Sequence, residues 1–442
     1  MALEQQTTRA QRIALVFEDF AGGGVQRSML RTADGLLRRG FAVDLAVARA
    51  DGPLLPEVPP QARVVELARS SLWRAGACAL PDRTILEPLL TSKKARKSMR
   101  YLPALVGYFR SKQPNAVLAA TARYNLAVLW ARRLADLDAV VVVSQHVQSS
   151  DPTLPPGVLR GGHPATLIRR GYLQADVIVA VSNGVADDLA ACAGIPRSRI
   201  TTVYNPVVGP DLVAKAQHSL DHPWFASGEP PVVLGVGRPD PQKDFATLIR
   251  AFVRVRAQRP ARLLILGGSE DDQSHAEYAH KLRALPKELE LAQDVSYAGF
   301  VANPFAFMSR AAVFVLSSRY EGLGNVLIEA LACGTPVVST DCPSGPAEIL
   351  DNGRFGPLVP VGDDRAMAAA IAATLERPMA AATLQARAQT FSVDRAVDRY
   401  VHLMFIRGHR DEPQAGGKEK GNGGRPGARQ DGPLPSPLRC WP

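Results

Sequence analysis

The chain is 442 residues long, which exceeds the length of one ordinary hydrophobic core and makes two domains the expectation. Hydrophobic residues make up 46% and charged residues 21%, a composition that excludes the disordered class. The net charge of +10 favours anionic partners, which include nucleotides, phosphate-bearing substrates, nucleic acid and an acidic membrane face.

The cysteines and the apolar runs bear on the cellular compartment. Five cysteines form an odd set without a Cys-x-x-Cys pair, which argues against a disulfide framework or a zinc knuckle and fits a reducing compartment. The first apolar run is too short for a signal sequence, and no segment approaches the ~18 apolar residues that a spanning helix needs. The sequence therefore predicts a cytoplasmic protein.

Short apolar runs alternate with longer helical stretches along the chain, and most of these runs lack a polar face. Such runs are typical of strands in a parallel sheet that is covered on both sides. In the first half they are 12–18, 42–48, 63–67, 115–120, 139–144 and 176–181. After a break rich in Pro and Gly at 204–210 and 221–231, they are 231–237, 262–268, 294–300, 312–318 and 336–340. Two such series predict two doubly wound α/β domains, with ligand-binding loops that face a cleft between them.

Glycines follow the first predicted strand in "FAGGGVQRS" (20–28). They allow the backbone to approach a ligand closely, and the next helix offers free N–H groups to an anion. A dinucleotide fingerprint with Asp44 as the ribose ligand is the rival interpretation, but Arg27 stands where its third Gly belongs. A glycine turn without a ligand is the remaining alternative.

Two cations follow the first strand of the second series in "GVGRPDPQKDFATLI" (235–249). Arg238 and Lys243 lie on a loop at a strand's carboxyl end, directly before a helix. Arg as a planar fork and Lys as a mobile point charge suit a diphosphate. The alternative is a pair of solvated surface cations, which this location disfavours.

The stretch "YEGLGNVLIEALACGTPVVST" (320–340) predicts a helix that begins near Gly322–Leu323 and ends at Gly334. The amides at its start, from Gly324, Asn325 and Val326, have no partners within the helix. They form an anion site that needs no side chain.

Two carboxylates flank this anion site, Glu321 before the helix and Glu329 within it. They would oppose a bound phosphate unless they bind neutral hydroxyls, and a sugar nucleotide has hydroxyls on both sides of its diphosphate. Glu321 is then expected to hold the sugar and Glu329 the ribose. A solvated helix face is the alternative for Glu329, but its neighbours are apolar, and a buried Glu needs a partner.

The longer run "EGLGNVLIEALACGTPVVSTDCPSGPAEIL" resembles the signature of retaining glycosyltransferases of the GT-B fold, in particular glycosyltransferase family 4. Other family marks occur in order: the three glycines, "SQH" at 144–146, "SNGVADDL" at 182–189, and "VGR" with the later Lys. The resemblance covers roughly residues 12–408. It implies a first, acceptor-side domain at 1–205, a nucleotide-sugar domain at 206–390, and a helix at 391–410 that crosses back to the first domain. We expect the Gly- and Pro-rich residues 411–442 to form a disordered tail.

The resemblance also assigns roles to individual residues. It implies that Arg238 and Lys243 neutralise the donor diphosphate, that Glu329 binds the ribose and that Glu321 contacts the transferred sugar. It implies that His146 approaches this sugar from the first domain and that Gly23 and Gly24 close over the reaction centre. The catalytic set is Arg238, Lys243, Glu321 and His146. The nucleotide-sugar-binding set is Gly23, Gly24, Gly322, Leu323, Gly324, Asn325, Val326 and Glu329.

The implied reaction is front-side, retaining transfer of a hexose or N-acetylhexosamine from a nucleotide-diphosphate sugar, with UDP favoured. The acceptor would be a glycan or lipid-linked glycan in surface polysaccharide, lipopolysaccharide or glycolipid assembly. No metal, cofactor or nucleic-acid partner is expected. A sugar-nucleotide epimerase or hydrolase on the same fold, and a non-catalytic sugar-nucleotide-binding protein, are the alternatives.

The segment "SKKARKSMRYLPALVGYFRSK" (92–112) holds seven basic residues and no acid. Met99, Leu102, Val106 and Phe109 recur in it at helical spacing, although Pro103 should end or kink a helix near Leu102. One interpretation is a helix with its apolar side on the first domain and its charges in water. The other is reversible docking on an anionic membrane, which would make the protein peripheral on the inner face of that membrane.

Overall fold

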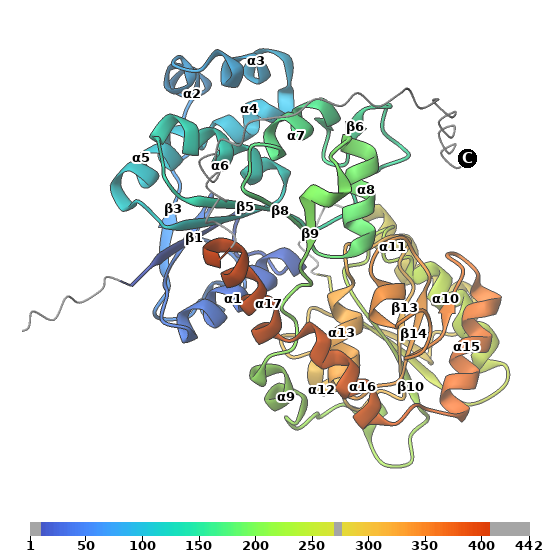
Figure 1. Cartoon of the computed structure of the whole chain (residues 1–442). Helices are drawn as coiled ribbons and strands as arrows, with labels where there is room; N and C mark the ends of the chain where they lie inside the picture. Colours follow the sequence, from blue (N-terminus) through green and yellow to red (C-terminus); the bar gives the residue numbers. More distant parts are fainter. Residues whose placement is uncertain (1–9, 269–275, 407–442) are drawn as a thin grey trace, which may run out of the picture. The chain divides into compact units, whose positions relative to one another are not determined.

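The structure is a computed structural model that describes residues 10–268 and 276–406. Two parallel β-sheets, each flanked by helices, account for most of these residues (Figure 1). The prediction of two Rossmann-like α/β domains is therefore confirmed. The exact domain boundaries stay a prediction. No helix among the described residues has both the length and the apolar character needed to cross a membrane.

The first sheet has the strand order β3-β2-β1-β4-β5-β8-β9, and all its neighbouring strands are parallel. Its strands are β1 (Arg12–Phe17), β2 (Ala42–Val47), β3 (Arg63–Glu66), β4 (Ala116–Ala120), β5 (Val140–Gln145), β8 (Val177–Ala180) and β9 (Ile200–Thr202). A small antiparallel pair, β6 (Val158–Leu159) and β7 (His163–Pro164), lies outside this sheet.

The second sheet has the strand order β12-β11-β10-β13-β14-β15 and is also parallel throughout. Its strands are β10 (Val232–Val236), β11 (Arg262–Leu266), β12 (Val295–Gly299), β13 (Val313–Leu316), β14 (Val337–Thr340) and β15 (Leu358–Val359).

The helices of the first series alternate with, or follow, its strands. They are α1 (Gly24–Arg38), α2 (Leu72–Ala79), α3 (Arg83–Thr91), α4 (Lys93–Met99), α5 (Leu102–Lys112), α6 (Ala122–Ala135), α7 (Ala165–Tyr172) and α8 (Asn183–Ala193). The later helices are α9 (Pro210–Ala216), α10 (Phe245–Arg256), α11 (Ala276–Glu288), α12 (Phe305–Met308), α13 (Asn325–Ala332), α14 (Pro346–Ile349), α15 (Asp364–Glu376), α16 (Ala381–Ala388) and α17 (Val393–Val401).

Each strand predicted from an apolar run is present, with ends within two residues of the prediction. The strands that the sequence did not predict in the two sheets are β9 and β15, which are short and lie at sheet edges. An edge strand pairs on one side and needs no long apolar run, so its pattern is weak.

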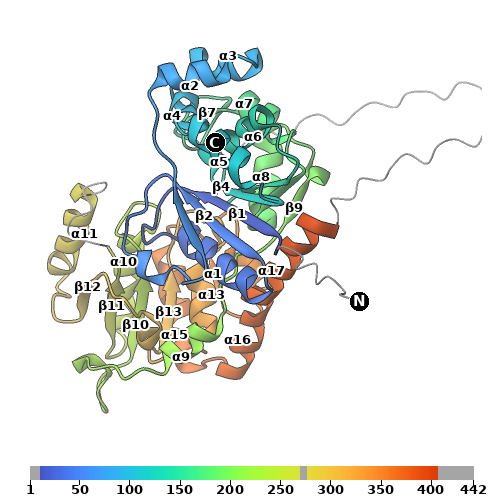
Figure 2. The same cartoon turned by 90° about the vertical axis from the view of Figure 1, so that its left-hand side faces the viewer.

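The last helices run along both domains (Figures 1 and 2). α16 packs against α13, and α17 packs against α1. At the second contact, a side chain on Gly35 would come within 2.6 Å of Val397, so the absence of a Cβ permits the close approach. Within the described residues, the helix predicted at 391–410 is α17 followed by a π-helical turn at His402–Ile406. The predicted tail 411–442 lies outside the described residues.

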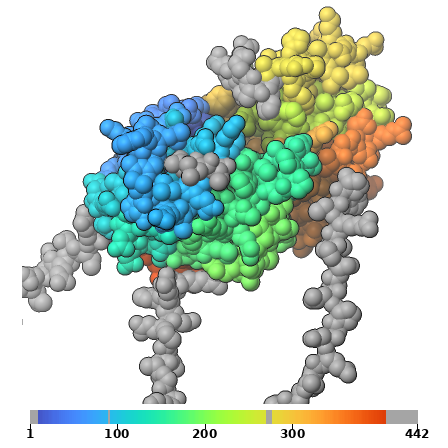
Figure 3. All heavy atoms as spheres, turned by 90° about the horizontal axis from the view of Figure 1, so that it is seen from above, coloured from blue at the N-terminus to red at the C-terminus, as the bar shows by residue number. Residues whose placement is uncertain are grey.

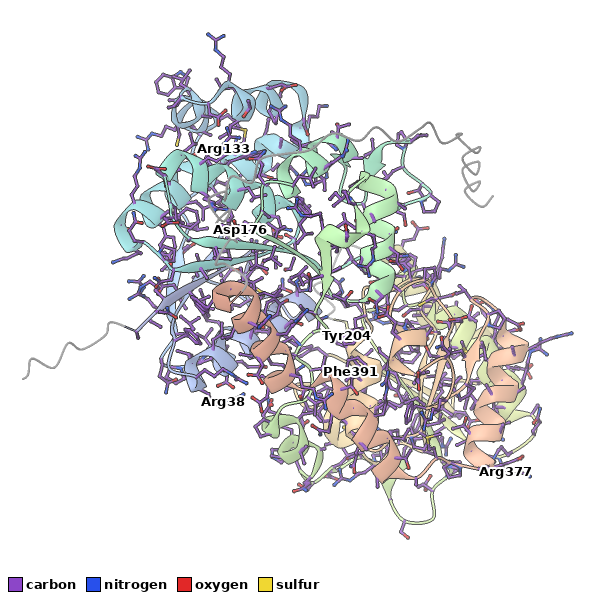
Figure 4. All side chains as sticks on the ribbon, in the orientation of Figure 1. Arg38, Arg133, Asp176, Tyr204, Arg377 and Phe391 are labelled. Atoms are coloured by element: carbon purple, nitrogen blue, oxygen red, sulfur yellow. The ribbon has the colours of Figure 1, made fainter. Side chains whose placement is uncertain are left out.

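Two connections between the domains run side by side. The amides of Val207 and Val208 donate to the carbonyl of Phe391, and the Val393 amide donates to the carbonyl of Val208. The rings of Tyr204 and Phe391 meet edge to face with centroids 5.0 Å apart. Figure 4 labels these two residues, which lie next to each other. These contacts hold the two connecting segments, 204–208 and 391–393, against each other.

Candidate active site

The helix at the centre of the candidate site, α13, starts slightly later than predicted. Gly324 is its N-cap residue and has φ +96°, a left-handed conformation that favours glycine, so the helix begins at Asn325 rather than near Gly322–Leu323. The first-turn amides of Asn325 and Val326 have no acceptor within the helix. Gly322 and buried Leu323 form the approach to this helix and do not belong to it.

Glu321 and Lys243 form an ion pair at this position. The Lys243 ammonium lies 2.7 Å from Oε1 of Glu321, and the same oxygen accepts a hydrogen bond of 2.7 Å from the Ser318 hydroxyl. Glu321 is buried, so its charge needs such partners. The aliphatic part of Lys243 passes over Gly237, where an added Cβ would lie 3.1 Å from it. The second domain therefore brings the predicted Lys and the first predicted Glu together.

Arg238 lies on the same loop but has a different environment. Its side chain is 69% exposed, and its guanidinium is 3.9 Å from the carboxylate of Asp240. It takes no part in the ion pair between Lys243 and Glu321. The structure thus separates the two predicted phosphate-binding cations into the partly buried Lys243 and the exposed Arg238.

Glu329 is buried within α13, and its partner comes from the first domain. Nη2 of Arg31, on α1, lies 3.2 Å from Oε1 of Glu329. The Nη1 atom of Arg31 is also buried and has no hydrogen-bond partner. Sequence reasoning missed Arg31, although it follows Gly24 and Ser28 at the i, i+4, i+7 spacing of one helix face.

The glycine loop before α1 reaches the start of α13. Gly23 is the N-cap of α1, and a Cβ added to Gly24 would lie 3.4 Å from the side-chain amide of Asn325. That Asn325 amide group also accepts a hydrogen bond of 2.9 Å from Asn205. The predicted glycines and the predicted phosphate-binding turn therefore lie next to each other.

His146 follows β5 and lies beside the same turn. A Cβ added to Gly322 would collide with the His146 carbonyl oxygen, at 1.9 Å, so only glycine fits there. Nε2 of His146 lies 2.9 Å from the hydroxyl of Ser144, which donates its own proton to the Ala119 carbonyl. Nε2 must therefore carry a proton. Nδ1 is left as a buried acceptor without a partner. Burial lowers the pKa of His146 to about 4, so the ring is neutral near pH 7.

The start of α8 provides further contacts between the domains that sequence reasoning missed. Its N-cap Ser182 donates a hydrogen bond of 2.6 Å to the Gly322 carbonyl. The Glu348 carboxylate accepts from the amides of Asn183 and Gly184, at 2.9 and 2.8 Å. A carboxylate at a helix N-terminus is favourable. Glu348 belongs to the family-like run and Ser182 opens another family mark, so both signals were present in the sequence.

The rival interpretation of Asp44 as a ribose ligand is wrong. Asp44 is fully buried in β2 and pairs with Arg12 and Arg63. It also accepts a hydrogen bond of 2.7 Å from the Tyr108 hydroxyl. All of these partners belong to the first domain, and they hold the Asp44 carboxylate in its interior. Within the described residues there is also no group of three or more His, Cys, Asp or Glu side chains placed to hold a metal ion.

Both halves of the chain match models of glycosyltransferase families. Residues 22–208 match the Glycosyltransferase Family 4 model, and residues 230–377 match the Glycosyl transferases group 1 model. A Campylobacter jejuni N-acetylgalactosamine-N,N'-diacetylbacillosaminyl-diphospho-undecaprenol 4-alpha-N-acetylgalactosaminyltransferase is 35% identical over 210 residues, which are 48% of this chain and 53% of that protein. The Rhizobium meliloti lipopolysaccharide core biosynthesis glycosyltransferase LpsE is 32% identical over 200 residues, or 45% and 54% of the two chains. The chain spans about half the length of these curated relatives.

Solved structures share the whole fold. A glycosyltransferase from Rickettsia africae superposes with a TM-score of 0.69 at 17% identity, covering 89% of this chain and 97% of that one. The Anabaena protein HepE, in complex with UDP and glucose, superposes with a TM-score of 0.66 at 18% identity, covering 89% and 98%. The chain therefore belongs to the GT-B glycosyltransferases and resembles family 4 over its first half and group 1 over its second.

Proposed function

We propose that the protein is a retaining glycosyltransferase that moves a hexose or N-acetylhexosamine from a UDP-sugar to a glycan or lipid-linked glycan. The observation that carries this proposal is the arrangement around α13, where two buried carboxylates with cationic partners flank a helix N-terminus. HepE is seen with UDP and glucose, and the names of the two relatives specify an undecaprenol-linked substrate and the lipopolysaccharide core. They support UDP as the nucleotide and surface-glycan assembly as the setting.

The proposed phosphate site combines a helix N-terminus with cations. The amides of Asn325 and Val326 bind the diphosphate, and the ammonium of Lys243 adds a full charge beside them. Arg238, which is exposed, closes over the diphosphate from the solvent side. These groups act where negative charge develops as the nucleotide leaves, so they stabilise the transition state more than the ground state.

The proposed hydroxyl-binding groups lie on both sides of the phosphate site. Glu329 accepts from the ribose hydroxyls and shares its charge with Arg31. Glu321 accepts from the transferred sugar. Nδ1 of His146 has a free lone pair in a buried position, which suits a hydrogen bond from a sugar hydroxyl.

Proton transfer needs no protein base in this proposal. The new bond joins an acceptor oxygen to the anomeric carbon on the face from which the bond to the phosphate oxygen breaks. The acceptor proton passes to that departing oxygen, and UDP leaves. The pKa of His146, about 4, is too low for an efficient base near neutral pH and supports a binding role for this residue.

We propose further that transfer needs no metal ion, because the cations and helix amides supply the charge that a metal would provide. Activity should then survive EDTA. Complete loss of activity on chelation, with recovery on addition of Mn²⁺, would contradict this assignment of the phosphate site.

A donor screen tests the proposed function. The protein is incubated with labelled UDP-sugars, with and without lipid-linked acceptors, and the anomeric configuration of the product is read by NMR. We expect transfer that requires an acceptor and retains the α configuration of the donor. Release of free sugar, or epimerised UDP-sugar, without any acceptor would support the hydrolase or epimerase alternative. Binding of a UDP-sugar without turnover would support the non-catalytic alternative.

A further inference from the structure

Residues 68–101, which we call the α2–α4 segment, lie at the front of the face seen in Figure 3. Three short helices form most of the segment, and each has a side-chain cap at its N-terminus, from Ser71, Asp82 and Ser92. The helices contact one another, and α2 and α4 also pack on α5 and α6, respectively. The segment is therefore a fixed part of the first domain.

The helix α2 is apolar on both of its faces. Ala75 and Ala79 are fully buried and make its inner face. Trp73 is 81% exposed and Leu80, whose backbone is still helical, is 66% exposed. Together with Ala77 they follow the i, i+4, i+7 spacing of a single outer face. A single exposed apolar side chain is ordinary, but a stripe that contains an almost fully exposed Trp indicates a binding surface.

The surroundings of this stripe are strongly cationic. The α2–α4 segment contains eight basic and two acidic residues. Both acids pair with cations from outside the segment, Asp82 with Arg133 and Glu87 with Arg170. The exposed basic residues are Arg69, Arg74, Arg83, Lys93, Lys94 and Lys97. The segment therefore presents a net positive charge around an apolar stripe.

For residues 92–112 the structure confirms the first interpretation, in which the apolar side packs on the first domain. The chain forms two helices there, α4 and α5, which are separated at Arg100–Tyr101, and Pro103 lies in the first turn of α5. The apolar residues at helical spacing, Met99, Leu102, Val106 and Phe109, are all buried. They pack on the domain core and supply no surface contact. Within this region α4 contributes charge, while the exposed apolar contact comes from α2.

We propose that the α2–α4 segment docks reversibly on an anionic lipid bilayer, with Trp73 and Leu80 in the interface and the basic side chains against lipid phosphates. Trp favours the membrane–water interface. Each basic residue near an anionic lipid surface raises the affinity of the protein for that surface by about fivefold. A protein partner fits less well because Lys is depleted from protein interfaces. A second copy of the chain would present the same positive charge and be repelled. The surface shares no residue with the candidate active site, so the proposal does not depend on the proposed function.

Co-sedimentation of the full chain with vesicles tests this proposal. Vesicles that contain phosphatidylglycerol should bind the protein at low salt, and phosphatidylcholine vesicles should not. High salt should release the protein, because screening shortens the reach of the charges to about 8 Å at physiological ionic strength and less above it. The W73A/L80A and K93S/K94S/K97S variants should each lower the affinity at least tenfold, an order-of-magnitude expectation from the loss of several such contacts.

Matched controls come from the second domain. Phe300 is 54% exposed, so F300A removes a comparable apolar group. Arg283, Lys287 and Arg377 are exposed, so R283S/K287S/R377S removes the same charge as the lysine variant. Both controls should bind vesicles like the wild type. Brominated phosphatidylglycerol should quench tryptophan fluorescence in the wild type and markedly less in W73F.

Three results would overturn the proposal. One is equal recovery of the wild type with anionic and neutral vesicles. The second is unchanged vesicle binding by W73A/L80A, with its melting temperature showing that it is folded. The third is a dimer in sedimentation velocity that W73A/L80A dissociates while vesicle binding stays unchanged, which would make the stripe a contact between two copies of the chain.

Discussion

The two carboxylates that flank the start of α13 differ in the origin of their partners. Glu321 pairs with Lys243 at 2.7 Å, and both residues belong to the second domain. Glu329 pairs at 3.2 Å with Arg31, a residue of the first domain that is 298 positions away in the chain. Both carboxylates are buried, and they are eight residues apart in the sequence.

This difference determines which of the two ion pairs depends on the contact between the domains. The Lys243–Glu321 pair needs only the second domain, so it should persist when the domains move apart. The Arg31–Glu329 pair exists only while α1 lies beside α13. Arg31 keeps one buried nitrogen without a hydrogen-bond partner, whereas the charges of Lys243 and Glu321 are paired with each other. The Lys243–Glu321 pair therefore depends on the second domain alone, whereas the Arg31–Glu329 pair depends on how α1 lies against α13.

The largest effect should come from the cations on the proposed leaving group. Lys243→Ala and Arg238→Ala should each lower turnover by roughly two to three orders of magnitude, as the loss of one transition-state charge contact does. Steady-state kinetics with the donor found in the screen measures this. Arg354→Ala, which removes an exposed arginine elsewhere on the second domain, is the control. Wild-type turnover in K243A or R238A would remove that residue from the site.

The stability of the same variants should separate the partly buried Lys243 from the exposed Arg238. Lys243→Ala leaves Glu321 buried without its cation and should lower the free energy of unfolding by about 3 kcal/mol. Glu321→Gln in the same chain should recover most of this loss, without restoring turnover. Arg238→Ala should stay within about 0.5 kcal/mol of the wild type, because its side chain is exposed. Urea unfolding measures the three values, and an equal loss in R238A and K243A would contradict the distinction.

Nucleotide binding should distinguish the two carboxylates themselves. Glu329→Gln should weaken the binding of free UDP by about tenfold, roughly the contribution of one charge-assisted hydrogen bond to the ribose. Glu321→Gln should change UDP affinity little, because its proposed ligand is the transferred sugar. Calorimetry with UDP measures both, with the exposed Glu376→Gln as the control. The reverse pattern would exchange the two roles.

The smallest effect concerns His146, the neutral group that the first domain places beside this charged site. Burial lowers the pKa of His146 from its ordinary value of 6.5 to about 4 in the folded protein. As the pH falls, the imidazole of the unfolded chain is therefore protonated first, which stabilises the unfolded state. The free energy of unfolding that is present above pH 6.5 is reduced between pH 6.5 and 4. Between pH 7 and 5.5 the wild type should lose about 1 kcal/mol more than His146→Gln. Parallel urea-unfolding curves for the two proteins at both pH values would show that this proton is not linked to folding.

Much of the fold and of the second-domain site could be predicted from the sequence. A parallel strand buried on both faces needs a continuous apolar run, and such runs located every strand of the two sheets except the edge strands β9 and β15 to within two residues per end. Glu321, Gly324, Asn325 and Glu329 stand within ten residues, so their relation follows from local helix geometry. The delayed start of α13 was not predicted because it depends on the left-handed backbone of Gly324.

The sequence by itself determined the two parallel sheets, the glycine loop before α1 and the order of groups around the α13 N-terminus, because each depends on neighbouring residues and on helical or strand periodicity. Only the tertiary structure decided that Arg31 contacts Glu329 and that Glu348 caps α8. It also decided that Asp44 forms ion pairs inside the first domain and that Trp73 lies outside the core. These features join residues distant in the chain, or depend on which helix face the core covers. The physical reason is that burial and long-range pairing are set by packing, which no local pattern of residue types records.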